Sequence, residues 1–227
     1  MATLIFHNSP DARSDARHDA AKIAHIKSKL CGATFSLNDK SEWRIGRALS
    51  ATAYQQDDPP LEARQVFGCI CIRDPGEQYT TVKVAVVKVK YQIQGTEESI
   101  EELKDLVSEY EEITPMSKQN VEANLRYAKQ KLNTATHPVH NPNSATSNEI
   151  QALKRFRDSD CPHTPHLIVA ETQRLVPELD QLSIPEGFLT WTIMTHLPGV
   201  RLISTEFWEK PEWQREQIRQ AFKIALM

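Results

Sequence analysis

The chain has 227 residues, a formal net charge of −3, 40% hydrophobic residues and 25% charged residues, which is the balance of an ordinary globular protein. A nucleic-acid-binding protein usually carries a basic surplus, and a membrane span needs a far longer apolar run than any in this sequence. The apolar patch at the N-terminus is too short for a signal peptide, so we expect a cytoplasmic protein without nucleic-acid or membrane partners.

The first elements predicted are a polar helix and a group of strands. Residues 10–30 have a modest apolar stripe with helical spacing, and residues 41–94 change to the period of strands. Three strands are expected within 41–54, 63–76 and 79–93. The turn RDPGEQ between the last two is short, which favours an antiparallel hairpin. The region is therefore predicted to be a three-stranded meander, with Cys69 and Cys71 as buried small side chains on one face of a strand.

Two helices with opposite charge are predicted over residues 96–134. The first carries eight acidic residues and one lysine, whereas the second is net basic and has Ser117 as a candidate N-cap. Helices of opposite charge can pair as a hairpin. Such a hairpin would be either a solvated insertion or a surface that binds a partner protein.

The remaining elements complete an α+β arrangement. A loop over 135–146 leads to a helix over 146–159, and strands are expected within 166–176 and 187–197. Ile218, Phe222 and Ala225 then lie on one face of a final amphipathic helix. Three strands, one helix and two strands in this order predict a five-stranded antiparallel sheet with one helix on a face.

Lysines inside the third predicted strand are the first candidates for a functional site. The stretch KVAVVKVKYQ places Lys88 and Lys90 on the same face, because side chains alternate along a strand. A charged side chain within an apolar run must reach solvent or find a partner. The two lysines therefore either line a solvated face of the sheet or pair with an acidic residue.

Glu149 is the acidic residue best placed to be that partner. It shares one helical face with Ala152, Leu153 and Phe156, which points it toward the sheet. A purely structural alternative is a capping box, in which Thr146 caps the helix and Glu149 reaches back to the Thr146 amide. A strand lysine paired with a helix glutamate is how protein kinases fix the lysine that binds the ATP phosphates.

Four stretches extend this analogy into a resemblance to a known family. VVKVKYQ, NEIQALKRFRDSDCPHTPHLI, GFLTWTIMTHLPGVRL and FWEKPEWQREQIRQAFKIAL together resemble fungal proteins of the protein-kinase-like, aminoglycoside-phosphotransferase-like superfamily. The resemblance covers residues 41–227 apart from the 96–143 insertion. It implies a kinase-like N-lobe over 41–197, an N-terminal extension over 1–40 and the start of a helical C-lobe over 198–227.

The resemblance also implies roles for individual residues. Lys88 would bind the phosphates of ATP, with Lys90 as the competing choice, and Glu149 would be the helix partner of this lysine. Met194 would lie at the back of the adenine pocket. Residues 195–197, from Thr195 to Leu197, would form a hinge whose backbone hydrogen-bonds adenine.

The sequence departs from the family at two places. The first turn, RIGRALSATAYQ, has Gly46 alone instead of the glycine-rich G-x-G-x-x-G pattern. Ser50 is a candidate phosphate contact there, although an ordinary β-turn explains it equally well.

The sequence also ends before the aspartates that serve kinases as catalytic base and Mg²⁺ ligand. We therefore expect a truncated and inactive nucleotide-binding lobe, with Mg²⁺ only if the missing C-lobe is supplied. The alternative is a stand-alone, pseudokinase-like interaction module.

Two further groups of residues have competing explanations. Clustered histidines and cysteines suggest zinc, but their spacing differs from paired zinc ligands, so loop residues facing water are favoured; they are Cys161, His163, His166, His137 and His140. Trp208 and Trp213, near Phe207, either pack the last helices or form a binding patch.

Overall fold

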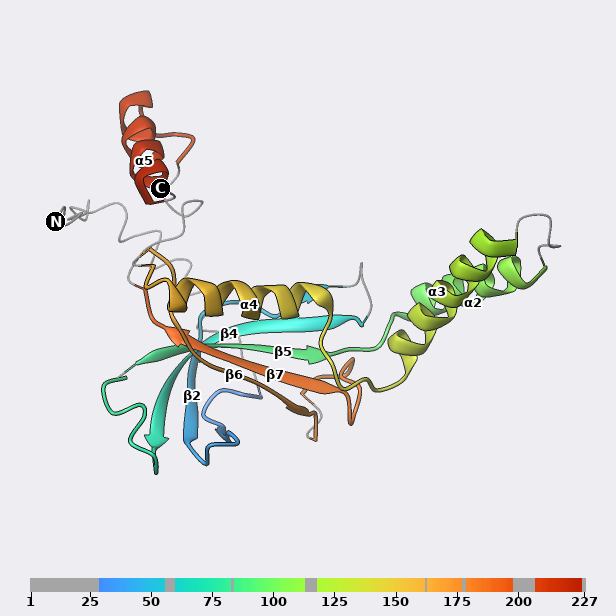
Figure 1. The fold of residues 1–227 in the computed structure, drawn as a ribbon, viewed down its shortest axis with the longest axis horizontal. Coiled ribbons are helices and arrows are strands. Elements are labelled where there is room, and N and C mark those ends of the chain that lie inside the picture. The colour runs from blue at the N-terminus through green and yellow to red at the C-terminus, as the bar shows by residue number, and fades with distance from the viewer. Residues whose placement is uncertain are drawn as a thin grey trace.

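The computed structural model describes residues 29–55, 60–82, 84–112, 118–161, 163–176, 179–197 and 207–225. The described residues form an α+β fold with an antiparallel sheet (Figure 1). In chain order the elements are β1 (Thr34–Ser36), β2 (Glu42–Ala48), β3 (Ala53–Gln55), β4 (Glu62–Arg73), β5 (Ala85–Gln92), α2 (Glu97–Glu112), α3 (Lys118–Thr136), α4 (Ser144–Asp158), β6 (Leu167–Arg174), β7 (Phe188–Thr195) and α5 (Glu212–Ala225).

The sheet has the strand order β1-β2-β4-β5-β7-β6, with β3 paired to β4, and every neighbouring pair is antiparallel. The predicted meander is confirmed as β2, β4 and β5, and the two later predicted strands are β6 and β7. The short strand β1 was not predicted, and the first predicted strand, within 41–54, is divided into β2 and the short strand β3. β1 and β3 each have three residues, which is too few for an alternating pattern to be recognised.

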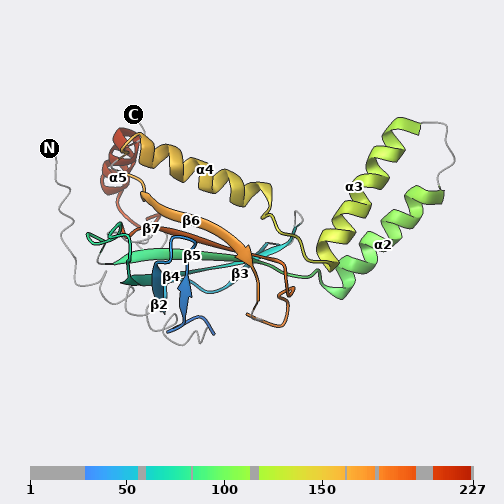
Figure 2. The ribbon, with the colours of Figure 1, turned by 60° about the horizontal axis from the view of Figure 1, so that its bottom comes forward.

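The main hydrophobic core lies inside the curl of this sheet. Alternate residues of β5, such as Val87 and Val89, are fully buried on that face. The curl brings β1 against β7, where the ring of Phe35 stacks on Trp191 with centroids 4.0 Å apart. Gln173 of β6 also donates to the Ser36 carbonyl at 3.0 Å. The core residues come from strands throughout this sheet, whose curl is visible in Figure 2.

The cysteine predictions are partly confirmed. Cys69 and Cys71 are free; Cys69 is buried and Cys71 is half-buried. Burial, with a smaller contribution from Cys71, raises the pKa of the Cys69 thiol to about 12. A thiol that stays protonated at neutral pH is a weak nucleophile, so Cys69 serves as a core side chain.

Helix α4 crosses the outer face of the sheet (Figure 2). It begins at Ser144, and its N-cap is Asn143, whose Oδ1 accepts from the Thr146 amide at 2.9 Å. The capping-box alternative was therefore wrong, because Asn143, a favoured cap, starts the helix before Thr146. The Thr146 hydroxyl is consequently available for contacts with the sheet.

The predicted helical hairpin is confirmed as α2 and α3, which extend away from the sheet (Figures 1 and 2). α2 has no buried residue. On α3, Ala128 and Ala135 are buried. The predicted cap Ser117 lies outside the described residues.

Two more expectations concern the predicted N-terminal helix and the tryptophans near α5. The helix predicted over 10–30 lies outside the described residues except at 29 and 30, which form a turn. Near α5, Phe207 is buried, but Trp208 and Trp213 are 78% and 61% exposed. The alternative in which both tryptophans are packed is therefore not supported, although the Trp208 ring contacts Phe207 edge to face with centroids 5.0 Å apart. None of the helices in the described ranges is both long and apolar enough to cross a bilayer.

Candidate functional site

Lys88 and Glu149 meet on the outer face of the sheet. Lys88 lies midway along β5, and Glu149 lies in the second turn of α4. Lys88 Nζ is 2.5 Å from Glu149 Oε1, and the two side chains are 18% and 32% exposed. The ion pair predicted from the strand alternation and the helical face is thus present. It is covered by α4 but still reachable from solvent.

Two lysines hold Glu149 in its ionised form. Burial acts to raise the pKa of this carboxyl, but the hydrogen bond from Lys88 and the charges of Lys88 and Lys90 outweigh it. The net result is a Glu149 pKa below its ordinary value of 4.5. The carboxylate is therefore negative at neutral pH and restrains the lysine ammonium groups beside it.

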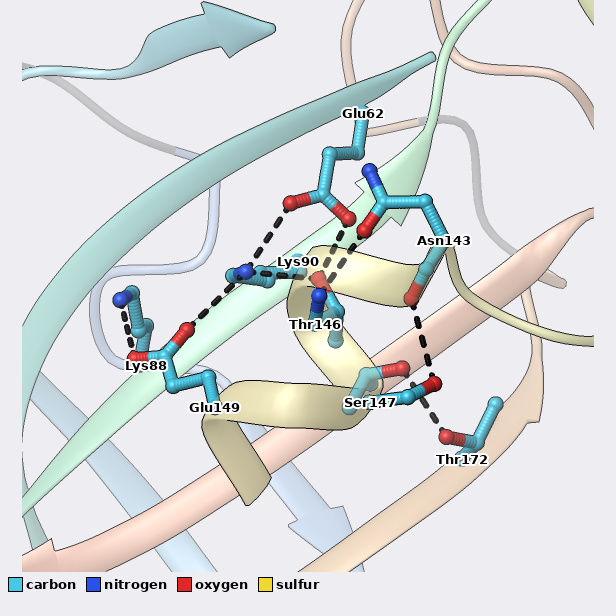
Figure 3. Close-up of polar contacts among 9 residues, drawn as sticks. Glu62, Lys88, Lys90, Asn143, Thr146, Ser147, Glu149 and Thr172 are labelled. Atoms are coloured by element: carbon cyan, nitrogen blue, oxygen red, sulfur yellow. Dashed lines mark hydrogen bonds and ion pairs between the residues drawn. The ribbon is translucent and has the colours of Figure 1, made fainter. Parts of the chain in front are cut away.

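Lys90 belongs to a buried cluster next to this pair (Figure 3). Lys90 Nζ lies 2.9 Å from Glu62 Oε1 of β4 and 3.0 Å from Glu149 Oε2. It also donates to Thr146 Oγ1 at 2.6 Å, and that hydroxyl donates to Glu62 Oε2 at 2.6 Å. Three oxygens thus lie within 3.0 Å of Lys90 Nζ; the contact with Glu62 Oε1 is an ion pair without hydrogen-bond geometry. Lys90 is 3% exposed, so the alternative of a solvated face was wrong for this residue.

The two lysines consequently differ in what they can do. For Lys88, Glu149 supplies the one acceptor that contacts Nζ within the described residues. An ammonium group has three donors, so Lys88 keeps donors for an added anion while it stays bound to Glu149. Lys90 has its donors engaged inside the protein. Of the two candidates, only Lys88 combines exposure with uncommitted hydrogen-bonding capacity.

Two of the other predicted site residues, Ser50 and Met194, lie on strands or turns close to Lys88. Lys88 is opposite Val66 on one side and Thr192 on the other. Ser50 is next to this row because its Oγ accepts from the Val66 amide at 3.0 Å. Met194 is opposite Val86, two residues from Lys88 along β5, and so faces the same side of the sheet.

The predicted hinge residues are placed less favourably for binding a base. The Thr195 amide donates to the His166 carbonyl at 2.9 Å, and the Thr195 hydroxyl accepts from the His166 amide. The Thr195 N–H is therefore used to close the end of the sheet. Leu197 is 43% exposed.

Gly46 does not lie in the first turn. It is inside β2, next to a register irregularity between Ile45 and Ala48. A Cβ at this position would lie 3.1 Å from the Gly68 carbonyl oxygen of β4. The glycine therefore permits a close approach of two strands rather than a phosphate-binding turn, and the turn itself begins after Ala48.

Sequence reasoning missed Glu62, Thr146 and Gln92 as parts of this region. Glu62 was placed before the predicted strand, and Thr146 was taken as a cap. A signal was nevertheless present: Lys88, Lys90 and Gln92 alternate, so all three must share a face, and the second lysine also needs an acceptor. The identity of that acceptor depends on the β4–β5 register, in which Glu62 is opposite Gln92.

A cavity of about 350 Å³ lies elsewhere, on the inner side of the sheet. Gln65 and Tyr91 line it, and their side chains alternate with Val66 and Lys90. Asp180 accepts the hydroxyl hydrogen bond of Tyr91 beside this cavity. The cavity therefore does not include the Lys88–Glu149 pair.

The histidines and cysteines do not assemble into a metal centre among the residues that the structure describes. His166 Nε2 contacts the Cys161 backbone carbonyl at 2.9 Å rather than the thiol. His137 contacts the neighbouring Thr136 hydroxyl at 2.8 Å.

Comparisons with protein-family models, with curated proteins and with solved structures find no match for this chain.

Proposed function

We propose that the sheet and α4 form the nucleotide-binding lobe of a kinase-like phosphotransferase, in which Lys88 binds the phosphates of ATP. The observation that carries the proposal is the 2.5 Å ion pair between Lys88 of β5 and Glu149 of α4. In kinases a strand lysine is held by a helix glutamate in this way and contacts nucleotide phosphates. Here Glu149 orients the ammonium group, and the exposed side of Lys88 receives the anion.

The charges of the site favour an added anion at Lys88 rather than Lys90. Two lysines and two carboxylates meet there, so the cluster of Lys88, Lys90, Glu62 and Glu149 is formally neutral. Since Lys90 is committed to Glu62, Glu149 and Thr146, only Lys88 can exchange part of its solvation for phosphate oxygens. Met194 lies on the same face of the neighbouring strand, on the side where a base would pack.

Binding rather than catalysis is the activity proposed for the described part of the chain. Phosphoryl transfer also requires an aspartate base and aspartate or asparagine ligands for Mg²⁺. No residue described near Lys88 takes these roles, and Mg²⁺ would enter only with a complete C-lobe. The lobe alone is therefore expected to bind nucleotide without transferring phosphate.

The second candidate function is a protein-interaction module without nucleotide. It is favoured by the α2–α3 hairpin, which extends from the sheet and whose helix α2 has no buried side chain (Figure 1). The two functions differ in their dependence on Lys88. Only nucleotide binding requires the free donors of this side chain.

A thermal-shift titration with ATP separates the two candidates. ATP at about 100 times its dissociation constant should stabilise the lobe by about 2.7 kcal/mol and raise the Tm. Lys88→Met should abolish this increase. Lys154→Met is the matched control, because Lys154 is an exposed lysine on α4, and the increase should remain. Equal Tm increases in the two variants would reject the role of Lys88.

A further inference from the structure

Lys88, Lys90 and Gln92 form a polar row along one face of β5. They occupy alternate positions, and all three contact the segment that leads from the hairpin into α4. Gln92 contacts the end of α3 and the following loop, Lys90 contacts the first and second turns of α4, and Lys88 contacts the second turn. The segment thus runs antiparallel to β5 and is held at three successive places.

Gln92 holds the first of these places. Its side chain is completely buried; Nε2 donates to the carbonyls of Thr134 at 2.9 Å and His137 at 2.8 Å. Its Oε1 accepts from the Val139 amide at 2.8 Å. A Cβ on Gly187 would lie 2.5 Å from this oxygen, so glycine is needed there. The amide therefore secures the chain where it returns from the hairpin.

Lys90 holds the second place by contacting two buried residues, Thr146 and Glu62. Thr146 lies on α4 and Glu62 lies on β4, and both contact Lys90 and each other. Side-chain exposure is 4% for Lys90 and 0% for Glu62. Buried charges with this many partners tolerate little displacement, because any movement leaves a charge uncompensated away from water. A shift of α4 along β5 would separate Thr146 from both.

We propose that Lys90, Glu62 and Thr146 form a clamp that positions α4, so that Glu149 remains on Lys88 before any nucleotide binds. This inference rests on the proposed nucleotide site and adds positioning residues to it. Lys90 acts through Glu149 and α4, not by contact with phosphate. Since the lobe is assembled in advance, ATP binding does not have to select a minor position of the helix.

Thr146 is the most selective place to test the clamp. Thr146→Val keeps the shape of the side chain but removes the hydrogen bonds to Lys90 and Glu62, whereas Thr146→Ser keeps the hydroxyl and serves as the matched control. Hydrogen–deuterium exchange of the α4 amides reports the position of the helix, and calorimetry with ATP reports binding. In Thr146→Val, exchange should rise by about tenfold and ATP affinity should fall by about tenfold. Thr146→Ser should resemble the wild type in both.

Two further variants separate positioning from direct binding. Lys88→Met should abolish ATP binding and leave α4 exchange within about threefold of the wild type, because Lys90 still holds Glu149 and Thr146. Lys90→Met combined with Glu62→Gln removes both charges of the buried pair and so avoids an unpaired carboxylate. This double variant should raise α4 exchange and weaken ATP binding without abolishing it.

Several results would overturn the clamp. Unchanged α4 exchange in Thr146→Val would reject it, as would increased exchange with unchanged ATP affinity. Complete loss of ATP binding in the Lys90→Met, Glu62→Gln variant, with α4 exchange unchanged, would show that Lys90 contacts phosphate directly. If wild-type protein does not bind ATP, the proposed function fails, whereas the exchange measurements still decide whether α4 is clamped.

Discussion

The β4–β5 ion pair beneath α4 and an ion pair on the α2–α3 hairpin have similar lengths but very different surroundings. Lys90 and Glu62 beneath α4 are 2.9 Å apart, with side chains 4% and 0% exposed. Lys129 and Glu111 on the hairpin are 2.6 Å apart, with side chains 53% and 51% exposed. Distance alone would suggest that the hairpin pair contributes more to stability than the pair beneath α4. Burial reverses this order, because water replaces a lost partner only at the exposed pair.

The two regions also differ in how they are joined to the sheet. The first two turns of α4 contact β5 through Lys88 and Lys90. The hairpin is secured at its base, where Gly95 N donates to the Ala135 carbonyl at 2.9 Å and Gln92 contacts the returning chain. We therefore expect substitutions beneath α4 and at the hairpin base to destabilise the fold much more than substitutions along the hairpin.

The largest effect is expected for Lys90→Met. The substitution leaves Glu62 buried without its counter-ion and should lower the free energy of unfolding by about 3–5 kcal/mol, measured by urea denaturation. Addition of Glu62→Gln removes the unpaired charge and should recover much of this loss. A single variant as stable as the wild type would contradict the difference between the buried and the exposed pairs.

Gln92→Ala should have the next largest effect. It leaves two carbonyls and one amide at the hairpin base without their partner and opens a cavity, which together should cost about 2–4 kcal/mol. Gln94→Ala is the matched control, because Gln94 is exposed and its substitution should change stability by less than about 0.5 kcal/mol. Equal effects on urea denaturation would show that Gln92 does not secure the base.

Glu149→Gln should have an intermediate effect that depends on pH. Because the Glu149 pKa is lowered in the folded protein, the ionised carboxylate stabilises the fold above about pH 4.5. This contribution disappears as pH falls through the folded pKa. The difference in unfolding free energy between wild type and variant should be about 1 kcal/mol at pH 7, since the pair is partly solvated, and should shrink in acid. A constant difference from pH 7 to pH 3 would contradict the ionised pair, and Glu102→Gln on α2 should leave the profile unchanged.

The smallest effect is expected for Lys129→Met on α3. Its ion pair with Glu111 is about half exposed on both sides, so the change in unfolding free energy should stay below about 0.5–1 kcal/mol and decrease further in high salt. A loss comparable with that of Lys90→Met would mean that burial does not distinguish the two regions.

Local sequence patterns were sufficient for several parts of the fold and site. Alternation identified β5 and put Lys88 and Lys90 on one face, and helical periodicity aimed Glu149 at that face. The meander followed from a short turn between two strands. These inferences succeeded because strand and helix periods act over a few residues and do not depend on distant contacts.

Other features depended on segments that meet only after folding. The capping-box alternative failed because Asn143 competes as the first cap, which frees Thr146 for Lys90 and Glu62. Gly46 was wrongly placed in a turn. Its actual role, a close contact with Gly68, arises only when β2 and β4 pair and so is not visible in the local sequence. The exposure of Trp208 and Trp213 likewise depends on which segments pack around them, and an apolar residue type alone does not reveal this.

The sequence by itself determined that two lysines share a face and that a helix glutamate points toward them. Only the tertiary structure decided which lysine is enclosed and which stays partly exposed. The β4–β5 register brings Glu62 to Lys90, and the seating of α4 adds Thr146, so Lys90 is enclosed while Lys88 remains partly exposed. The physical reason is that strand period sets the direction of a side chain, whereas solvent exposure and partners are set by segments distant in the chain.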